Sequence, residues 1–317
     1  MTHDMTTGSI TGGLLRFALP LMLGNLLQQF YNIADTWVVG RFLGADALAS
    51  VGSAYTLMVF LTSILLGLCM GSGAFFSILF GRKDEEHLKH SIFLSFCLIG
   101  AVTLLLTGLV FAGLDLILRL LQVPVELTVL MRSYLWVIFW GIPATFLYNY
   151  FANLLRSVGN SSTPLVFLAI SALLNIALDL VFVLVFHWGV EGAASATVIS
   201  QYVSGLGILL YTLLRFPNLR IRRQHMTWDA SILRDISRLS FLTCIQQSVM
   251  NLGILMVQGL VNSFRAVIMA AFAAAVKIDS FAYMPVQDFG NAFSTFVAQN
   301  YGAGEHQRIR RGIRSAF

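Results

Sequence analysis

The chain has 317 residues, of which 57% are hydrophobic and only 11% are charged, and its net charge is +5. A soluble domain with one core needs no such excess of apolar residues, so this composition predicts an all-α polytopic membrane protein. The cysteines Cys69, Cys97 and Cys244 lie in apolar segments without metal-site spacing, and no phosphate-binding GxxxxGK[ST] loop occurs, which argues against a metal centre and against ATP hydrolysis.

Apolar runs that break at charged or turn-rich points predict about eight membrane spans. They are expected at residues 14–40, 47–80, 88–113, 132–155, 163–187, 191–214, 236–262 and 266–301. The first run starts too late for a signal peptide and lacks a small-residue cleavage site, so no signal peptide is expected.

The basic residues predict the orientation of these spans. With the N-terminus inside, the inner segments hold Arg16, Arg82, Lys83, Lys89, Arg156, Arg215, Arg220, Arg222, Arg223, Arg234, Arg238, Arg308, Arg310, Arg311 and Arg314, and the outer segments hold only Arg41, Arg119, Arg132 and Arg265. The positive-inside rule then places the N-terminus in the cytoplasm and the protein in the plasma membrane, which in a bacterium is the inner membrane. Nucleic-acid binding by the arginines between 215 and 238 is the poorer interpretation, because no aromatic interleaving accompanies them.

The first span carries a polar stripe. At about 100° per residue, one face holds Asn25, Gln28, Gln29, Asn32, Asp35 and Thr36. That face must meet protein or water, so its amides either bond to other helices or line a substrate cavity. The candidate cavity residues are Gln28 and Asn32 of this span, together with Gln247 and Asn251 of the seventh span. Pro20 removes one backbone donor from the same span, which makes it either a conformational bending point or a purely structural kink.

The fifth span places Asn175 and Asp179 one helical turn apart on one face. An acid inside a span costs about 2.5–3.5 kcal/mol and usually serves a function. Neither Asp35 nor Asp179 has a basic partner expected inside the first six spans, so both are candidate coupling residues. Burial disfavours the charged form and suits a proton, whereas the oxygens of Asn175, Asp179 and Thr197 would also suit sodium. The sequence leaves the two ions open.

The last two spans repeat the first two. Residues 48–54 align with residues 269–275, Phe80-Gly81 aligns with Tyr301-Gly302, and Gln28-x-x-x-Asn32 aligns with Gln247-x-x-x-Asn251 after a small gap. Both copies start on the inner side, so the repeats are parallel and related by an axis along the membrane normal. The predicted domains are a six-helix lobe at 1–215, a basic linker at 216–233 and a partial second lobe at 234–317.

A complete second repeat predicts about four further spans after Phe317. Without them the polar stripe of Gln247, Asn251, Gln258 and Asn262 would face lipid, and the chain would bind its coupling ion without exporting. In the eighth span, Lys277, Asp279 and Asp288 flank Pro285 and are expected to be structural or to line a cavity.

Several motifs together resemble the multidrug and toxic compound extrusion (MATE) family over essentially the whole chain. They are the run Pro20 … Gln28-Gln29 … Asn32 … Asp35-Thr36 … Val39-Gly40 … Ala47-Leu48-Ala49, then Leu155-Arg156-Ser157-Val158-Gly159-Asn160, Asn175-x-x-x-Asp179 and Gln299-Asn300-Tyr301-Gly302-Ala303-Gly304. The resemblance implies a twelve-helix exporter with two six-helix lobes, driven by proton or sodium flux and expelling organic cations and other amphipathic compounds.

The family's coupling site in the first lobe matches Asp35, Asn175, Asp179 and Thr197, with Asn153 close by, and its bending proline matches Pro20. Some branches also carry a coupling carboxylate in the seventh span. Residues 239–261 have none, so the chain is more similar to the branches that couple through the first lobe. A further departure is the lack of the C-terminal spans.

The expected partners are small molecules, cationic or amphipathic, and membrane lipid, with no cofactor beyond the coupling ion and a monomeric state for the full-length protein. The nearest rival function is a flippase for lipids or lipid-linked sugars, which an arginine-lined cavity would favour. A more remote rival is an intramembrane hydrolase with Asp35 and Asp179 as a dyad. Aromatic and methionine side chains could line the pocket or simply pack: Phe30, Trp37, Met58, Trp136, Trp140, Tyr148 and Tyr283.

Overall fold

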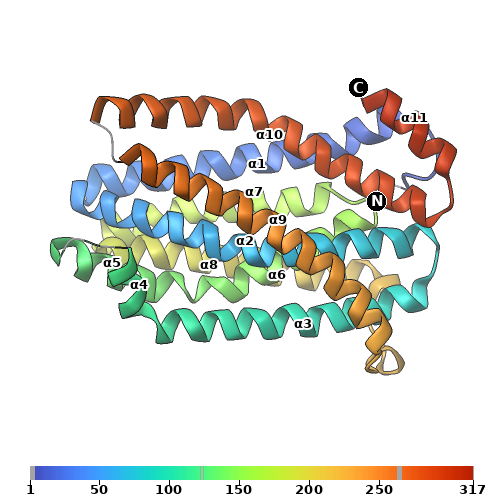
Figure 1. Cartoon of the computed structure of the whole chain (residues 1–317). Coiled ribbons are helices and arrows are strands. Elements are labelled where there is room, and N and C mark those ends of the chain that lie inside the picture. Colours follow the sequence, from blue (N-terminus) through green and yellow to red (C-terminus); the bar gives the residue numbers. More distant parts are fainter. Residues whose placement is uncertain (1–3, 122, 124, 263–265, 317) are drawn as a thin grey trace.

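The computed structural model describes residues 4–121, 123, 125–262 and 266–316, and it describes side chains there except those of residues 120 and 254–282. The regular structure of these residues is helical (Figure 1). The helices are α1 (Ile10–Phe42), α2 (Ala45–Gly81), α3 (Glu85–Ala112), α4 (Leu114–Leu120), α5 (Val125–Ile138), α6 (Gly141–Ser157), α7 (Ser162–Leu180), α8 (Gly189–Arg215), α9 (Ala230–Asn262), α10 (Ala266–Gly302) and α11 (His306–Ala316).

The predicted fold class is confirmed. Within the described chain, five helices are long and apolar enough to cross a membrane, or six if the bent pair α5–α6 counts as one span. The long helices α9 and α10, of 33 and 37 residues, coincide with the last two predicted spans.

The fourth span differs from its prediction because it is two helices bent by 44° at Phe139–Trp140. Gly141 and Pro143 open the second helix, where proline is tolerated because the first turn has no internal acceptors for its backbone donors. The fifth span also departs from a regular α-helix, since it ends in a π-helical turn at Val181–Val185.

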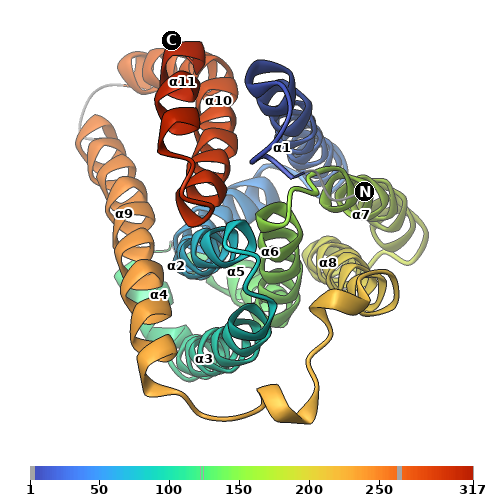
Figure 2. The ribbon, with the colours of Figure 1, turned by 90° about the vertical axis from the view of Figure 1, so that its right-hand side faces the viewer.

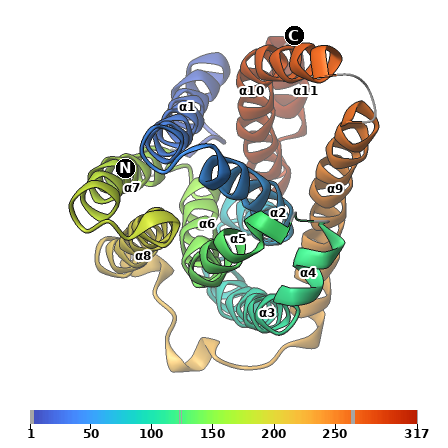
Figure 3. The same ribbon diagram turned by 90° about the vertical axis from the view of Figure 1, so that its left-hand side faces the viewer.

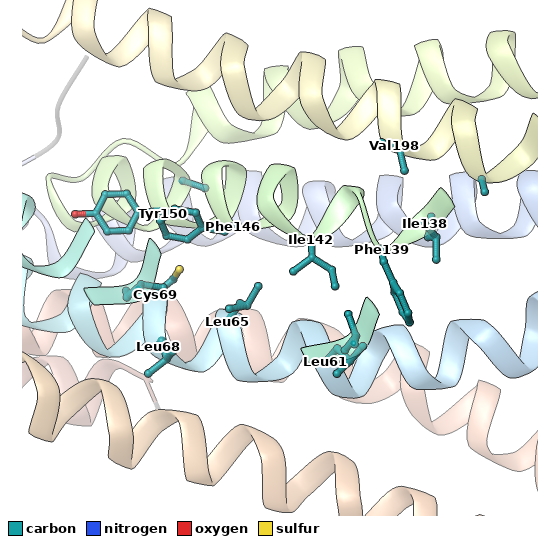
Figure 4. Close-up of a cluster of buried hydrophobic side chains, with 14 of the residues drawn as sticks. Leu61, Leu65, Leu68, Cys69, Ile138, Phe139, Ile142, Phe146, Tyr150 and Val198 are labelled. Carbon is teal, nitrogen blue, oxygen red and sulfur yellow. The ribbon is translucent and has the colours of Figure 1, made fainter. Parts of the chain in front are cut away.

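Helix α2 forms the centre of the core. Leu61, Leu65 and Cys69 project from it toward Ile142 and Tyr150 of α6, as Figure 4 shows. The buried Tyr150 hydroxyl donates to the Ile92 carbonyl oxygen at 2.6 Å, which ties α6 to α3. These contacts hold the first lobe together around α2 and α6.

Helices α9 and α10 pack on the first lobe from one side (Figures 2 and 3). Glycines bring α2 and α9 together, because a Cβ on Gly67 or Gly71 would overlap the backbone of Cys244 or Ser240. At the end of the bundle that carries the N-terminus, α2 and α10 cross reciprocally: Gly81 abuts Gln299, and Gly302 abuts Ile78. Residues 78 and 81 align with 299 and 302 in the repeat, so the two halves of this crossing are equivalent by the approximate two-fold symmetry of the repeat.

The linker between α8 and α9 passes beside α3 (Figure 2). Its buried His225 contacts the Glu86 carboxylate at 2.9 Å through Nε2, and its Thr227 contacts His90. The linker is therefore fastened to the first two turns of α3.

Candidate functional site

A cavity of about 560 Å³ lies between the first lobe and helices α9 and α10. Its walls come from α1, α2 and α5 to α10, and they include the four predicted cavity residues Gln28, Asn32, Gln247 and Asn251. Helical periodicity explains this, because residues three, four and seven apart share one face.

One prediction about this wall is wrong. Gln247 and Asn251 do not face lipid, because they line the cavity and Gln247 Nε2 lies 3.3 Å from the Met70 sulfur of α2. Helix α9 turns its polar face toward α2, which removes the cost of exposing amides to hydrocarbon. The other two residues of the predicted stripe, Gln258 and Asn262, lie outside the described side chains, as do Lys277 and Asp279.

A cluster of buried oxygen atoms lies behind the cavity wall. Asn175 and Asp179 of α7 are 2% and 0% exposed, and Asn175 Nδ2 donates to Thr197 Oγ1 of α8 at 3.2 Å. Asp35 of α1 lines the cavity and lies close enough to Asp179 for the two carboxyl groups to interact electrostatically. The structure thus brings together Asp35, Asn175, Asp179 and Thr197, which the sequence placed on three separate helices.

These oxygens lack donors. Among the described residues, no N–H or hydroxyl group donates to Asp35 Oδ1, Asn175 Oδ1 or either carboxyl oxygen of Asp179, although all are buried, and the two carboxyl groups have only each other as partners. A buried carboxylate without partners is costly, and two facing carboxylates cannot both carry a charge cheaply. The arrangement therefore suits a bound proton or a small cation.

Tyr134 of α5 belongs to the same site, and the sequence did not single it out. It is 6% exposed, it lines the cavity, and its hydroxyl lies within electrostatic reach of both Asp35 and Asp179. The sequence signal was a tyrosine among apolar residues in the fourth span, but nothing in that span indicates its depth relative to the acids on other helices.

Asn153 and Pro20 lie on the cavity wall without joining the oxygen cluster in any hydrogen bond of the described residues. Asn153 Nδ2 donates to the Asn149 carbonyl oxygen of its own helix at 2.8 Å. Pro20 is half-buried, and α1 continues through it from Ile10 to Phe42. Their predicted roles in coupling and bending remain predictions.

The end of the cavity that lies toward the N-terminus is charged. The interiors of the first six spans were predicted to lack lysine and arginine, and this is wrong for the fourth span: Arg156 lines the cavity, and its Nε is buried without a hydrogen-bond partner among the described residues. Helix α6 continues past the predicted span end to Ser157, which places this arginine at the end of the cavity toward the N-terminus. Asp288 of α10 and Asn25 of α1 lie on the same wall, joined by a hydrogen bond of 2.5 Å.

The aromatic candidates divide between the cavity and the outer surface. Met58 and Tyr148 line the cavity. The remaining five are exposed on the outside of the bundle: Phe30, Trp37, Trp136, Trp140 and Tyr283.

The sequence pattern of the MatE family matches residues 20–181 and 239–317, which include both α1–α2 and their repeat α9–α10. The chain belongs to the MatE family. The resemblance that its motifs indicated is thus confirmed.

Relatives of known name agree with this assignment. The chain is 33% identical to the probable multidrug resistance protein YpnP of Bacillus subtilis over 97% of its length and 68% of that protein. It is also 26% identical to a FAD transporter of Shewanella oneidensis over 98% of its length and 70% of that protein. A solved structure of a MOP superfamily transporter from Pyrococcus furiosus superposes with a TM-score of 0.91 at 23% identity, covering 99% of this chain and 70% of that one, which shows the shared fold.

Proposed function

We propose that the protein is a secondary active exporter, and not an enzyme, which expels cationic or amphipathic small molecules in exchange for protons. The observation that carries this proposal is the cluster of buried, donor-free oxygens of Asp35, Asn175 and Asp179 behind the cavity wall. Such a cluster binds a cation more tightly when it is dry than when it is hydrated, so ion binding favours one arrangement of the helices around the cavity.

The proton is the proposed ion because Asp35 and Asp179 face each other across α1 and α7 and can share one proton at little cost. Efflux from cells expressing the protein should collapse with an uncoupler and be indifferent to the replacement of sodium by potassium. Sodium dependence at fixed pH would instead assign the site to sodium, with Asn175, Asp179 and Thr197 as ligands.

Asp179→Asn should abolish export while the protein still inserts and folds. The amide keeps the shape of the side chain and its hydrogen-bonding capacity but removes the titration. Efflux of a cationic dye at equal expression measures the effect, with Asp115→Asn as the matched control, since Asp115 is exposed and pairs with Arg132 at 3.0 Å. Wild-type efflux from Asp179→Asn would remove this residue from the coupling site.

A flippase or exporter of anionic amphiphiles is the second candidate, and Arg156 is the observation that favours it. A guanidinium group on the cavity wall can bind a phosphate or carboxylate in a bidentate manner. If the substrate is anionic, Arg156→Gln should raise its KM strongly. If the substrate is cationic, the same variant should leave the KM unchanged or lower it.

We also propose that the N-terminal end of the bundle faces the cytoplasm of the cell that bears the protein in its plasma membrane. Most lysines and arginines lie at that end, among them those of α11 and of the linker from Pro217 to Asp229. A protease added to sealed inside-out vesicles should cleave this linker, and the same protease added to intact cells should not.

A further inference from the structure

Asp288 of α10 is a buried acid of the second half of the chain, remote in sequence from the acids of the first lobe. It is only 3% exposed. Its Oδ1 accepts a hydrogen bond from Asn25 Nδ2 of α1, and its Oδ2 is buried without a hydrogen-bond partner among the described residues. Such an oxygen is costly to bury on an ionised group and much less costly on a neutral carboxylic acid.

This acid stands at the contact between α1 and α10. One turn further along α10, Ala292 is fully buried against Leu14, Phe17, Ala18 and Leu21 of α1. We call this contact, from Asn25 and Asp288 to Leu14 and Phe296, the α1–α10 seam. Asp288 lies at the end of this seam that borders the cavity. Opening of the seam would therefore bring water to the carboxyl group from the other end, the side of Leu14 and Phe296.

The repeat shows that packing does not require an acid here. The alignment of Gly81 with Gly302 also aligns Gly67 of α2 with Asp288, and the alignment of Gln28 with Gln247 aligns Asn25 with Cys244. At the contact between α2 and α9, Gly67 lies directly on the backbone of Cys244. The equivalent contact between α10 and α1 therefore holds a hydrogen-bonded carboxyl group at the position where α2 and α9 make a close backbone contact.

We propose that Asp288 is a second protonation site of the transporter, occupied by a proton while the α1–α10 seam is closed and emptied when the seam opens. The proposal rests on the proton-coupled export proposed above and adds a site on α10 to the pair Asp35 and Asp179 on α1 and α7. Closure removes water from the carboxyl group and favours its neutral form. Separation of α1 from α10 breaks the bond to Asn25, hydrates the carboxyl group and lets the proton leave on that side.

The charges around Asp288 permit this cycle. Arg156 of α6 is the charged side chain whose field reaches Asp288 in the described part of the structure, and it favours ionisation. Helix α1 contributes the neutral Asn25, and α2 and α9 present Met70, Ser77 and Gln247 to the same cavity. Arg308 of α11 is occupied by the N-terminal segment. Burial therefore favours the neutral acid and the single arginine favours the carboxylate. Hydration on opening removes the effect of burial.

Infrared spectroscopy of the purified protein in lipid tests this directly, because a protonated carboxyl group has a C=O stretching band distinct from that of a carboxylate. The wild-type spectrum at neutral pH should contain one protonated-carboxyl band that Asp288→Asn lacks. The same band should be lost from Ala292→Leu, since a larger side chain at that fully buried position forces the seam apart. Gly290→Ala is the matched control on the same helix, where an added Cβ meets no atom within 4 Å, and it should keep the band.

If Asp288→Asn leaves every protonated-carboxyl band intact across the pH range in which the protein is folded, Asp288 carries no proton and the proposal is wrong. Persistence of the band in a folded Ala292→Leu variant would also overturn the link to seam opening. Circular dichroism identifies a variant that has not folded, and then Ala18→Leu, at the other side of the seam, replaces it. The infrared result does not depend on transport, so a wild-type protein with the band but without proton-driven efflux would refute only the proposed function.

Discussion

Two of the contacts between the second half of the chain and the first, the α2–α9 seam and the α1–α10 seam, are made equivalent by the repeat but differ in chemistry. In the α2–α9 seam, formed by Gly67, Gly71, Ser240 and Cys244, glycines let two backbones touch, and Ser72 and Ser240 share a hydrogen bond of 2.9 Å. Small residues with close backbone contact give rigid helix packing in membranes.

The α1–α10 seam places Asp288 and Ala292 where α2 has Gly67 and Gly71. It is held by side chains, namely the Asn25–Asp288 bond and an apolar cluster around Phe296. It is also tied at its end, because Arg308 donates three hydrogen bonds to the carbonyl oxygens of Met5, Thr7 and Gly8. Side-chain contacts can be exchanged for water whereas interlocked backbones cannot, so the α1–α10 seam is the one suited to open and close.

The largest effect is expected from Gly71→Ala in the α2–α9 seam. The added methyl group would overlap the Ser240 backbone and should lower the free energy of unfolding by about 2–3 kcal/mol. Denaturant unfolding in detergent micelles measures it, and Gly52→Ala on the same helix, where the Cβ meets no atom within 4 Å, is the control. Equal stability of the two variants would mean that the α2–α9 seam is not the rigid one.

A smaller and local effect is expected from Arg308→Ala. Loss of its hydrogen bonds should release the segment from Thr6 to Ser9 at a cost of about 1–3 kcal/mol, without unfolding the lobe, whereas Met5 keeps its bonds to Gln299 and Asn300. Hydrogen exchange of the N-terminal peptide should accelerate, and Arg311→Ala, an exposed residue of the same helix, should leave it unchanged. Acceleration across α2 and α9 as well would show that the two seams open together.

The smallest effect concerns the linker, which lies outside both seams. The hydrogen bond from His225 holds the pKa of Glu86 below its ordinary value. A carboxylate with a depressed folded pKa stabilises the folded state above its unfolded pKa, and that contribution is lost as the pH falls through the folded value. Acidification should therefore release residues 217–225 from α3.

Hydrogen exchange of residues 217–225, measured over a range of pH in the wild type and in two variants, checks this prediction. Glu86→Gln should show the fast exchange already at neutral pH, whereas Glu85→Gln, whose partner is Lys89 at 3.3 Å within α3, should behave as wild type. A linker that stays protected in Glu86→Gln would mean that the His90–Thr227 contact alone fastens it.

The sequence by itself determined the spans, the polar face of α1, the two-span repeat and the family. The spans and the polar face follow from hydropathy and from periodicity along one chain segment, because a span needs about twenty apolar residues wherever it packs. The repeat follows from alignment of the chain with itself, and the family from the resemblance of its motifs. It also indicated Asp35, Asn175, Asp179 and Thr197, because a polar oxygen inside hydrocarbon is conspicuous on any helix.

Only the tertiary structure decided which faces meet. Periodicity states which residues share a side of one helix but not which helix lies opposite or at what depth, and so the sequence could not show that Tyr134 joins the acids. For the same reason it misplaced Arg156, whose position at a span end is compatible with solvent or with a cavity floor. The pairing of Asn25 with Asp288 arises from a helix crossing between segments more than two hundred residues apart, which depends on packing of the two halves and on no local property of either.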